Sequence, residues 1–240
     1  MRLGYLDSSG GISAATLLAA LLSAGADESA LRAAVGTLDV PTFELRIDQM
    51  DTGQVASMGV TVRTKERDVT RRLRDIRGIF ASSGLGEFPR RIAGEVYRRL
   101  AHAEARIHGT TPESVSFHEV GRLESIVCVA GAATALEMLN IDRMLASPIS
   151  TGRGTVSTSH GILPIPAPAT AELLRGLPAV HGGTTGELTT PTGAALVATL
   201  ATEFGAEPPM TAVEVGYGAT TLIGGTTRLT RVLVGEVPSG

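Results

Sequence analysis

The sequence has no tryptophan, only one cysteine, and aromatic residues at 3% of its 240 positions. With so few aromatic rings, the core must be built from Ala, Leu, Val and Ile. A single cysteine excludes a disulfide framework and a cysteine-based zinc site, and it is typical of a protein from a reducing compartment. A net charge of −3 supplies no overall field that would attract nucleic acid.

Long apolar runs are also missing. No stretch approaches the roughly 18 consecutive apolar residues of a membrane span, so we expect no membrane partner. The N-terminal segment "RLGYLD" reads as a strand and lacks the basic region and cleavage site of a signal peptide. Together with the single cysteine, these features predict a cytoplasmic protein.

Short apolar runs and Gly- or Pro-bounded helical patterns alternate along the chain, which predicts an α+β (mixed α/β) fold of short sheets packed with Ala/Leu-rich helices. Without a repeat or linker, residues 1–240 should form one compact domain, in which residues 1–65 could form a small β-α-β-β lobe. The expected strands are 3–6, 43–50, 56–64, 211–219 and 230–237, and the expected helices are 13–24, 28–38, 89–108, 123–139, 166–175 and 190–204. Ala-rich helices with few aromatics often complete their cores against another chain, so we expect a homo-oligomer.

Two segments between residues 60 and 110 have helical periodicity. In the arginine-rich segment 63–79, Val69, Leu73 and Ile76 fall on one side, so the charges should form a mostly solvated face. No aromatic platform accompanies these charges, and we expect no nucleic-acid binding. The second helix starts near Pro89 and stops at Gly109.

Five ionisable residues could form a reactive site. Glu104 and His108 are four positions apart, so they share one edge of the helix that begins at Pro89. His118 and Glu119 follow a short strand, and His160 precedes a stiff segment, "GILPIPAPAT", that would fix its direction. A histidine beside a carboxylate can act as a general base. The same groups, above all His108, His118 and Glu119, could instead hold a divalent metal. A structural role is the simpler explanation for any one of these histidines alone.

Gly- and Thr-rich segments at helix starts could bind an anion through free backbone N–H groups. The alternative is plain helix capping and tight turns. The candidate ligand-binding residues are Ser13, Glu187, Thr189, Thr190, Thr192, Gly193, Tyr217 and Gly218.

Several segments together resemble a known family over nearly the whole chain. "YLDSSGGIS", "AHAEARIHG", "FHEVGRLESIV", "SHGILPIPAPAT", "GELTTPTGAAL" and "VGYGA" occur in the order seen in the N-terminal domain of LarC-type nickel-insertion proteins. The resemblance implies a cytoplasmic protein of nickel-pincer cofactor synthesis. Such proteins place nickel into a pyridinium bis-thiocarboxylate mononucleotide, using CTP.

The sequence departs from the family pattern at several positions. Ala15 stands where an acidic residue is expected, and Glu124 and Cys128 replace the two aspartates of a D-S-I-V-D pattern. Residues 60–75 contain no histidine, whereas the family commonly has a His-rich tract there. The sequence also stops where typical members continue into a C-terminal domain.

Three hypotheses stay open. The first is a LarC-like protein that binds or metallates a pyridinium mononucleotide, with nickel involved. The second is a recruited paralogue with metal-independent His/Glu acid–base chemistry, such as isomerisation, elimination (a lyase reaction) or cyclisation, on a small anionic or heteroaromatic molecule. The third is a non-catalytic partner subunit that works with a separate C-terminal-domain chain.

Overall fold

A computed structural model describes residues 1–51, 55–67, 69–159, 161–222 and 224–237. The described helices are α1 (Ala14–Ser23), α2 (Glu28–Val35), α3 (Leu73–Ser82), α4 (Glu87–His108), the short 3₁₀ helix η1 (Glu119–Gly121), α5 (Leu123–Met138), α6 (Pro168–Leu173) and α7 (Pro191–Leu200). The described strands are β1 (Arg2–Gly10), β2 (Phe43–Asp51), β3 (Ala56–Thr64), β4 (Arg71–Arg72), β5 (Ser116–Phe117), β6 (Arg143–Ala146), β7 (Ile149–Arg153), β8 (Thr155–Thr158), β9 (Gly161–Pro164), β10 (Ala179–Glu187), β11 (Ala201–Phe204), β12 (Thr211–Thr221) and β13 (Thr227–Glu236).

The largest sheet has seven strands in the order β11-β6-β1-β13-β12-β3-β2. β1 lies near its centre, parallel to β6 and antiparallel to β13. The strands of residues 1–65 therefore share one sheet with the C-terminal strands. Three two-stranded sheets, β10-β7, β4-β5 and β8-β9, complete the described strands. The predicted α+β class and single compact domain are confirmed.

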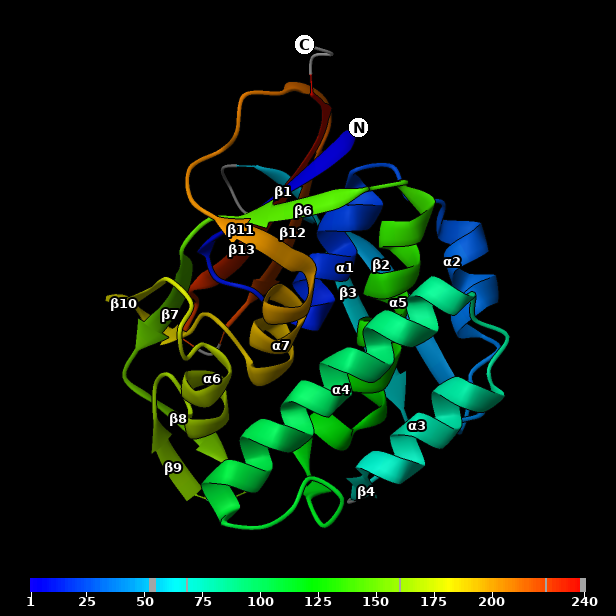
Figure 1. The fold of residues 1–240 in the computed structure, drawn as a ribbon, viewed down its shortest axis with the longest axis vertical. Coiled ribbons are helices and arrows are strands. Elements are labelled where there is room, and N and C mark those ends of the chain that lie inside the picture. Colours follow the sequence, from blue (N-terminus) through cyan, green and yellow to red (C-terminus); the bar gives the residue numbers. More distant parts are fainter. Residues whose placement is uncertain (52–54, 68, 160, 223, 238–240) are drawn as a thin grey trace.

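The helices form successive layers in front of this sheet (Figure 1). α1 packs against β12, β3 and β13, α5 packs on α1, and α4 packs on α5. The first of these contacts requires glycine on the strand. A Cβ atom added at Gly218 would lie 1.9 Å from the carbonyl oxygen of Thr16 on α1.

The alanine-rich helices are buried inside the chain itself. In α5, an unbroken run from Ile126 to Leu136 is buried, and Gly131 lets the side chain of Leu18 on α1 approach closely. Because small residues allow α1 and α5 to pack tightly within one molecule, their composition alone does not require a second chain to cover them.

α4 follows the sequence prediction closely. Pro89 lies in its first turn, and Ile92, Val96 and Leu100 are buried along one face. Gly109 ends the helix in the left-handed conformation, with φ of +62°, which glycine adopts without strain. Ile107, near the end of the helix, is 39% exposed and lies beside a cavity described below.

Two predicted helical segments differ most from the structure. The helix expected to run from residue 190 to 204 ends at Leu200, because residues 201–204 pair with β6 as strand β11. In the arginine-rich segment, α3 begins only at Leu73. Leu73 and Ile76 are buried as predicted, but Val69 precedes the helix and is 36% exposed.

Among the helices that the structure describes, none combines the length and the apolar character needed to cross a lipid bilayer.

Candidate functional site

A cavity of about 500 Å³ opens at the C-terminal end of α4. Its walls come from α4, the segment 116–125, the β8-β9 hairpin, the start of α6, the end of β10 and the start of α7. Seven of the predicted site residues line it: Glu104, His108, His118, Glu119, Glu187, Thr190 and Thr192. Side chains from positions 104 to 192 thus share one cavity, among them four of the five ionisable residues singled out from the sequence. The volume suits a small-molecule ligand.

Glu104 and His108 form one wall as a pair. Since they are one helical turn apart on α4, the His108 Nε2 atom lies 3.4 Å from Glu104 Oε2. Glu104 is the more buried of the two side chains. A carboxylate at this distance restricts the orientation of the imidazole ring.

The His118–Glu119 turn is held from behind by two buried side chains. The Tyr97 hydroxyl donates a hydrogen bond of 2.9 Å to the carbonyl oxygen of Val120. The Arg71 guanidinium donates one of 2.9 Å to the carbonyl oxygen of Gly121. Residues on both sides of the pair, including Phe117, are buried. The backbone is therefore fixed while His118 and Glu119 face the cavity.

The other arginines of segment 63–79 are exposed, as expected, but Arg71 is buried. Its side chain is turned inward and also pairs with Glu66, at 2.9 Å, with each of the two side chains only 10% exposed. The short β4-β5 pairing places Arg71 opposite Phe117 and thereby directs it behind the turn. Sequence spacing carried no signal for this role, since neighbouring arginines look alike.

Glu119 is arranged to stay ionised. Partial burial alone would raise its pKa, but hydrogen bonds from the backbone N–H groups of Ser159 and of Glu119 itself outweigh this effect and lower the pKa. The Ser159 bond is 2.7 Å long. Ser159 comes from the β8-β9 hairpin, so this contact also closes one side of the cavity.

Glu187 has the opposite tendency. Burial raises its pKa, and the charge of Arg228 opposes that rise only in part. Arg228 is itself buried and donates its hydrogen bonds to the backbone carbonyl oxygens of Leu188 and Glu187. The same cavity therefore contains one carboxyl group with a lowered pKa and one with a raised pKa.

The start of α7 supplies hydroxyl groups to the cavity. Thr190 caps the helix by accepting a hydrogen bond of 3.2 Å from the N–H of Gly193, and its hydroxyl lies 3.2 Å from that of Thr192. Thr189, Gly193 and Ser13 do not line the cavity. Thr189 donates to the Ser150 carbonyl at 2.6 Å, and Ser13 caps α1.

Tyr217 and Gly218 lie apart from the cavity, on β12 against α1. The Tyr217 N–H donates to Ser23 Oγ at 3.1 Å, and Gly218 provides the close approach to α1 described above. Gly- and Thr-rich composition suggested a binding loop there, but close packing of a strand on a helix needs the same glycine. His160 lies outside the described residues.

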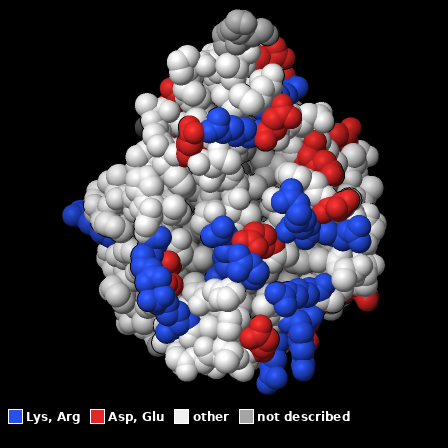
Figure 2. Space-filling model, in the orientation of Figure 1, with Lys and Arg blue, Asp and Glu red and all other residues white. Residues whose placement is uncertain are grey.

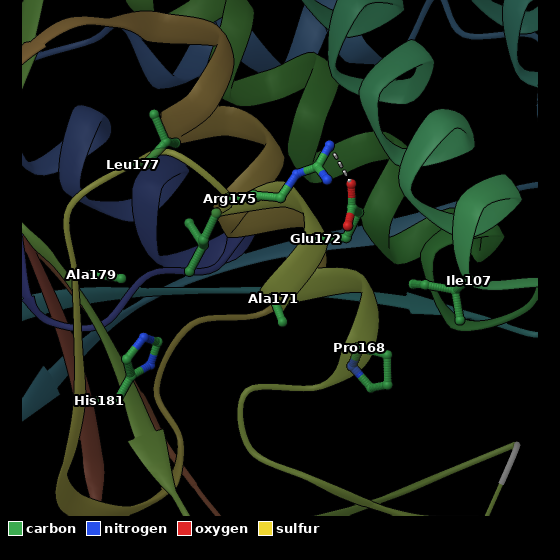
Figure 3. A pocket seen from close by; sticks show the side chains of 9 residues that line it. Ile107, Pro168, Ala171, Glu172, Arg175, Leu177, Ala179 and His181 are labelled. Carbon is green, nitrogen blue, oxygen red and sulfur yellow. Dashed lines mark ion pairs between the residues drawn. The ribbon is translucent and has the colours of Figure 1, made fainter.

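A second hollow of about 420 Å³ adjoins the cavity and shares Ile107 and Pro168 with it (Figure 3). His181 lies in this hollow, with Nδ1 3.1 Å from the hydroxyl of the buried Thr151. In Figure 3, Arg175 extends toward Glu172 and away from His181.

Metal ligands do not form a closed set in the part of the chain that the structure describes. No group of three or more His, Cys, Asp or Glu side chains there is close enough to hold an ion. Cys128 is buried in α5, and burial raises the pKa of its thiol to about 12, so it offers no thiolate. The cavity instead offers imidazole and carboxylate groups in pairs, at the end of α4 and on the turn.

These features define an α+β protein whose cavity has the volume for a small molecule and carries imidazole and carboxylate groups on its walls. Comparison with known proteins gives the family. The nickel insertion protein family matches residues 4–239, and the chain belongs to it.

Two relatives illustrate the likeness. The chain is 42% identical over 219 residues to the pyridinium-3,5-bisthiocarboxylic acid mononucleotide nickel insertion protein of Nocardioides sp., an alignment covering 91% of this chain and 56% of the relative. It is 40% identical over 237 residues to the protein of the same name from Desulfitobacterium hafniense, covering 99% of this chain and 59% of the relative. The chain thus spans less than two thirds of these relatives. No solved structure matches it.

Proposed function

We propose that this chain takes part in nickel insertion, holding nickel as cargo beside a pyridinium mononucleotide in the cavity at the end of α4. The observation that carries the proposal is the shared cavity of Glu104, His108, His118 and Glu119. Imidazole and carboxylate are suitable nickel ligands. An incomplete protein ligand set leaves coordination positions for the acceptor molecule.

The acceptor would supply the remaining ligands. The names of the two relatives specify a pyridinium ring with two thiocarboxylic acid groups, and sulfur is a softer ligand than carboxylate oxygen. In this proposal, nickel leaves the protein groups as the sulfur atoms of the acceptor replace them. Glu119, with its lowered pKa, stays anionic and available to the metal.

Nickel binding to the purified chain tests the proposal. We expect about one nickel ion per chain by metal analysis after dialysis, and loss of that ion in His118→Ala. His181→Ala is the matched control, because His181 lies in the neighbouring hollow and outside the cavity. Wild-type protein without measurable nickel affinity, or equal loss in both variants, would contradict the proposal.

A second function is favoured by one observation, the opposite pKa shifts of Glu119 and Glu187. Pairs of carboxyl groups whose pKa values are pushed apart serve as base and acid in metal-independent catalysis. Here Glu119 would be the base and Glu187 the acid, with a histidine assisting, in an isomerisation, elimination or cyclisation. Catalytic turnover of a small molecule that persists in a strong chelator and has a bell-shaped pH profile would favour this metal-independent function over nickel insertion.

The proposal also covers the setting in which the chain acts. It places the protein in the cytoplasm, as a homo-oligomer or together with a separate chain carrying a C-terminal domain. Sedimentation analysis of the purified chain tests self-association, and copurification from the native source tests the partner. A monomer that recovers no partner would contradict both.

A further inference from the structure

A groove of about 540 Å³ lies between α4 and α6, on the side of α4 away from the cavity residues Glu104 and His108. Four arginines line it, Arg98, Arg99 and Arg106 from α4 and Arg175 from the turn that follows α6, together with His102. Basic side chains gather on this face of the molecule, over α3 and α4 (Figure 2). The concentration is local, because the whole chain has a net charge of −3.

The arginines of the groove outnumber the carboxylates that neutralise them. Arg98 and Arg99 share Glu95, and Arg106 and Arg175 share Glu172. Four guanidinium groups on two carboxylates leave a surplus of two positive charges. A dianion is the ligand that would balance this surplus.

The guanidinium groups beside α6, those of Arg106 and Arg175, also have N–H donors that face solvent. Arg106 and Arg175 approach Glu172 only to 3.4 and 3.3 Å, which is longer than the roughly 2.7–2.9 Å of a charge-assisted hydrogen bond. Both side chains are well exposed, at 59% and 60%. An arginine has five N–H donors in a planar fork that matches the oxygen spacing of phosphate. Two such guanidinium groups, one from α4 and one from the turn after α6, can bind one phosphate group.

The cavity has the opposite character. Three carboxylates, Glu104, Glu119 and Glu187, line it, and no lysine or arginine is among its described lining residues. A phosphate group would therefore be repelled there, whereas a metal cation or a pyridinium ring would be attracted. The hollow of Figure 3 lies between the two sites, sharing Ile107 and Pro168 with the cavity and Glu172 and Arg175 with the groove.

We propose that the groove between α4 and α6 binds the phosphate of the mononucleotide, separately from the acidic cavity that handles the metal. This inference rests on the proposed function, which supplies the mononucleotide as the ligand. Arg106 and Arg175 hold the phosphate by paired hydrogen bonds, and Arg98 and Arg99 add charge. Binding at the groove precedes or accompanies entry of the ring into the cavity through the intervening hollow.

Calorimetric titration of the metal-free chain tests the groove, with inorganic pyrophosphate and nicotinic acid mononucleotide as probes. We expect both to bind, to compete with each other, and to bind about tenfold or more weakly to Arg106→Gln/Arg175→Gln, since hydrogen bonds to charged groups are lost. Arg106→Lys should give an intermediate loss, because it keeps the charge without the fork. The control Arg74→Gln/Arg77→Gln removes two exposed arginines of α3 outside the groove.

Four outcomes of these titrations would overturn phosphate binding at the groove. Equal weakening in the groove and control variants would reveal general charge attraction and overturn the proposal, as would no pyrophosphate binding at millimolar concentration. Pyrophosphate binding without competition by the mononucleotide, or preferential binding of an acidic peptide, would also overturn it. Nickel affinity of the same proteins separates the two claims. A groove variant should keep nickel binding, and a chain that binds pyrophosphate through these arginines but never nickel would refute only the nickel function.

Discussion

Replacing Arg71 with methionine removes the guanidinium that links Glu66 to the His118–Glu119 turn. In the native protein, Arg71 bonds the Glu66 carboxylate and the Gly121 carbonyl, and the Arg71 and Glu66 side chains are each 10% exposed. The variant leaves the mostly buried carboxylate of Glu66 without its partner, which typically lowers the free energy of unfolding by about 3–5 kcal/mol. It also leaves the Gly121 carbonyl without this donor.

A double variant separates these two costs. In Arg71→Met/Glu66→Met, the unpaired charge is gone, and replacing a buried ion pair with apolar side chains is often close to neutral. The remaining loss is the unpaired Gly121 carbonyl, about 1–3 kcal/mol. Both variants lose the Gly121 hydrogen bond, so the double variant should be more stable than the single variant by the cost of the unpaired carboxylate, about 3–5 kcal/mol.

Urea unfolding followed by circular dichroism measures the series. The control Arg77→Met alters an exposed arginine of α3 and should stay within about 0.5 kcal/mol of the wild type. Nickel affinity should fall in both Arg71 variants, since both release the backbone behind His118 and Glu119. A single variant as stable as the control, or a double variant no better than the single one, would refute the buried role of Arg71.

Two further predictions follow from the fold and the cavity. Gly218→Ala should destabilise the protein by about 1–3 kcal/mol or more, because the new Cβ would lie 1.9 Å from the Thr16 carbonyl oxygen. The control Gly78→Ala, at an exposed helical position with open space, should stabilise the protein by about 0.5–1 kcal/mol. Equal effects of the two substitutions in thermal unfolding would contradict the packing role of Gly218. The second prediction concerns Glu187, whose pKa is raised by burial in the folded state. Between the ordinary carboxyl pKa and the raised one, the folded protein therefore binds more protons than the unfolded chain. The free energy of unfolding should fall as the pH rises through this range. Glu187→Gln should remove this pH-dependent loss of unfolding free energy, which is about 1.4 kcal/mol for each unit by which the pKa is raised. Urea unfolding at several pH values measures it, and an unchanged pH dependence in the variant would contradict a raised pKa for Glu187.

The sequence carried enough information to place α4 and one side of the cavity. Pro89, the apolar spacing and Gly109 fixed the helix, and its period then placed Glu104 beside His108. It could not show that Arg71 turns inward while Arg72 and Arg74 stay outside. That difference depends on the pairing of β4 with β5, two residues each, which has no periodic signal.

The overextended helix at 190–204 and the misread glycine have a common physical origin. Residues 201–204 continue a helix-like composition, and only their pairing with β6 turns them into β11. Gly218 has the composition of a loop, yet its function in the fold is to let α1 approach β12. In each case a distant partner decides the conformation, and local sequence does not contain that partner.

The charges around α4 suggest why one helix can serve two ends of an insertion reaction. A closed set of ligands holds a structural metal permanently, whereas cargo must leave, and the cavity offers Glu104–His108 and His118–Glu119 as separate pairs. The opposite requirement holds for an anionic acceptor, which needs a surplus of cationic groups where no carboxylate repels it. α4 presents Glu104 and His108 to the cavity and Arg98, Arg99 and Arg106 to the groove. In the proposed reaction, separating the two charges across a helix would let the metal and the phosphate each bind without cancelling the field that attracts the other.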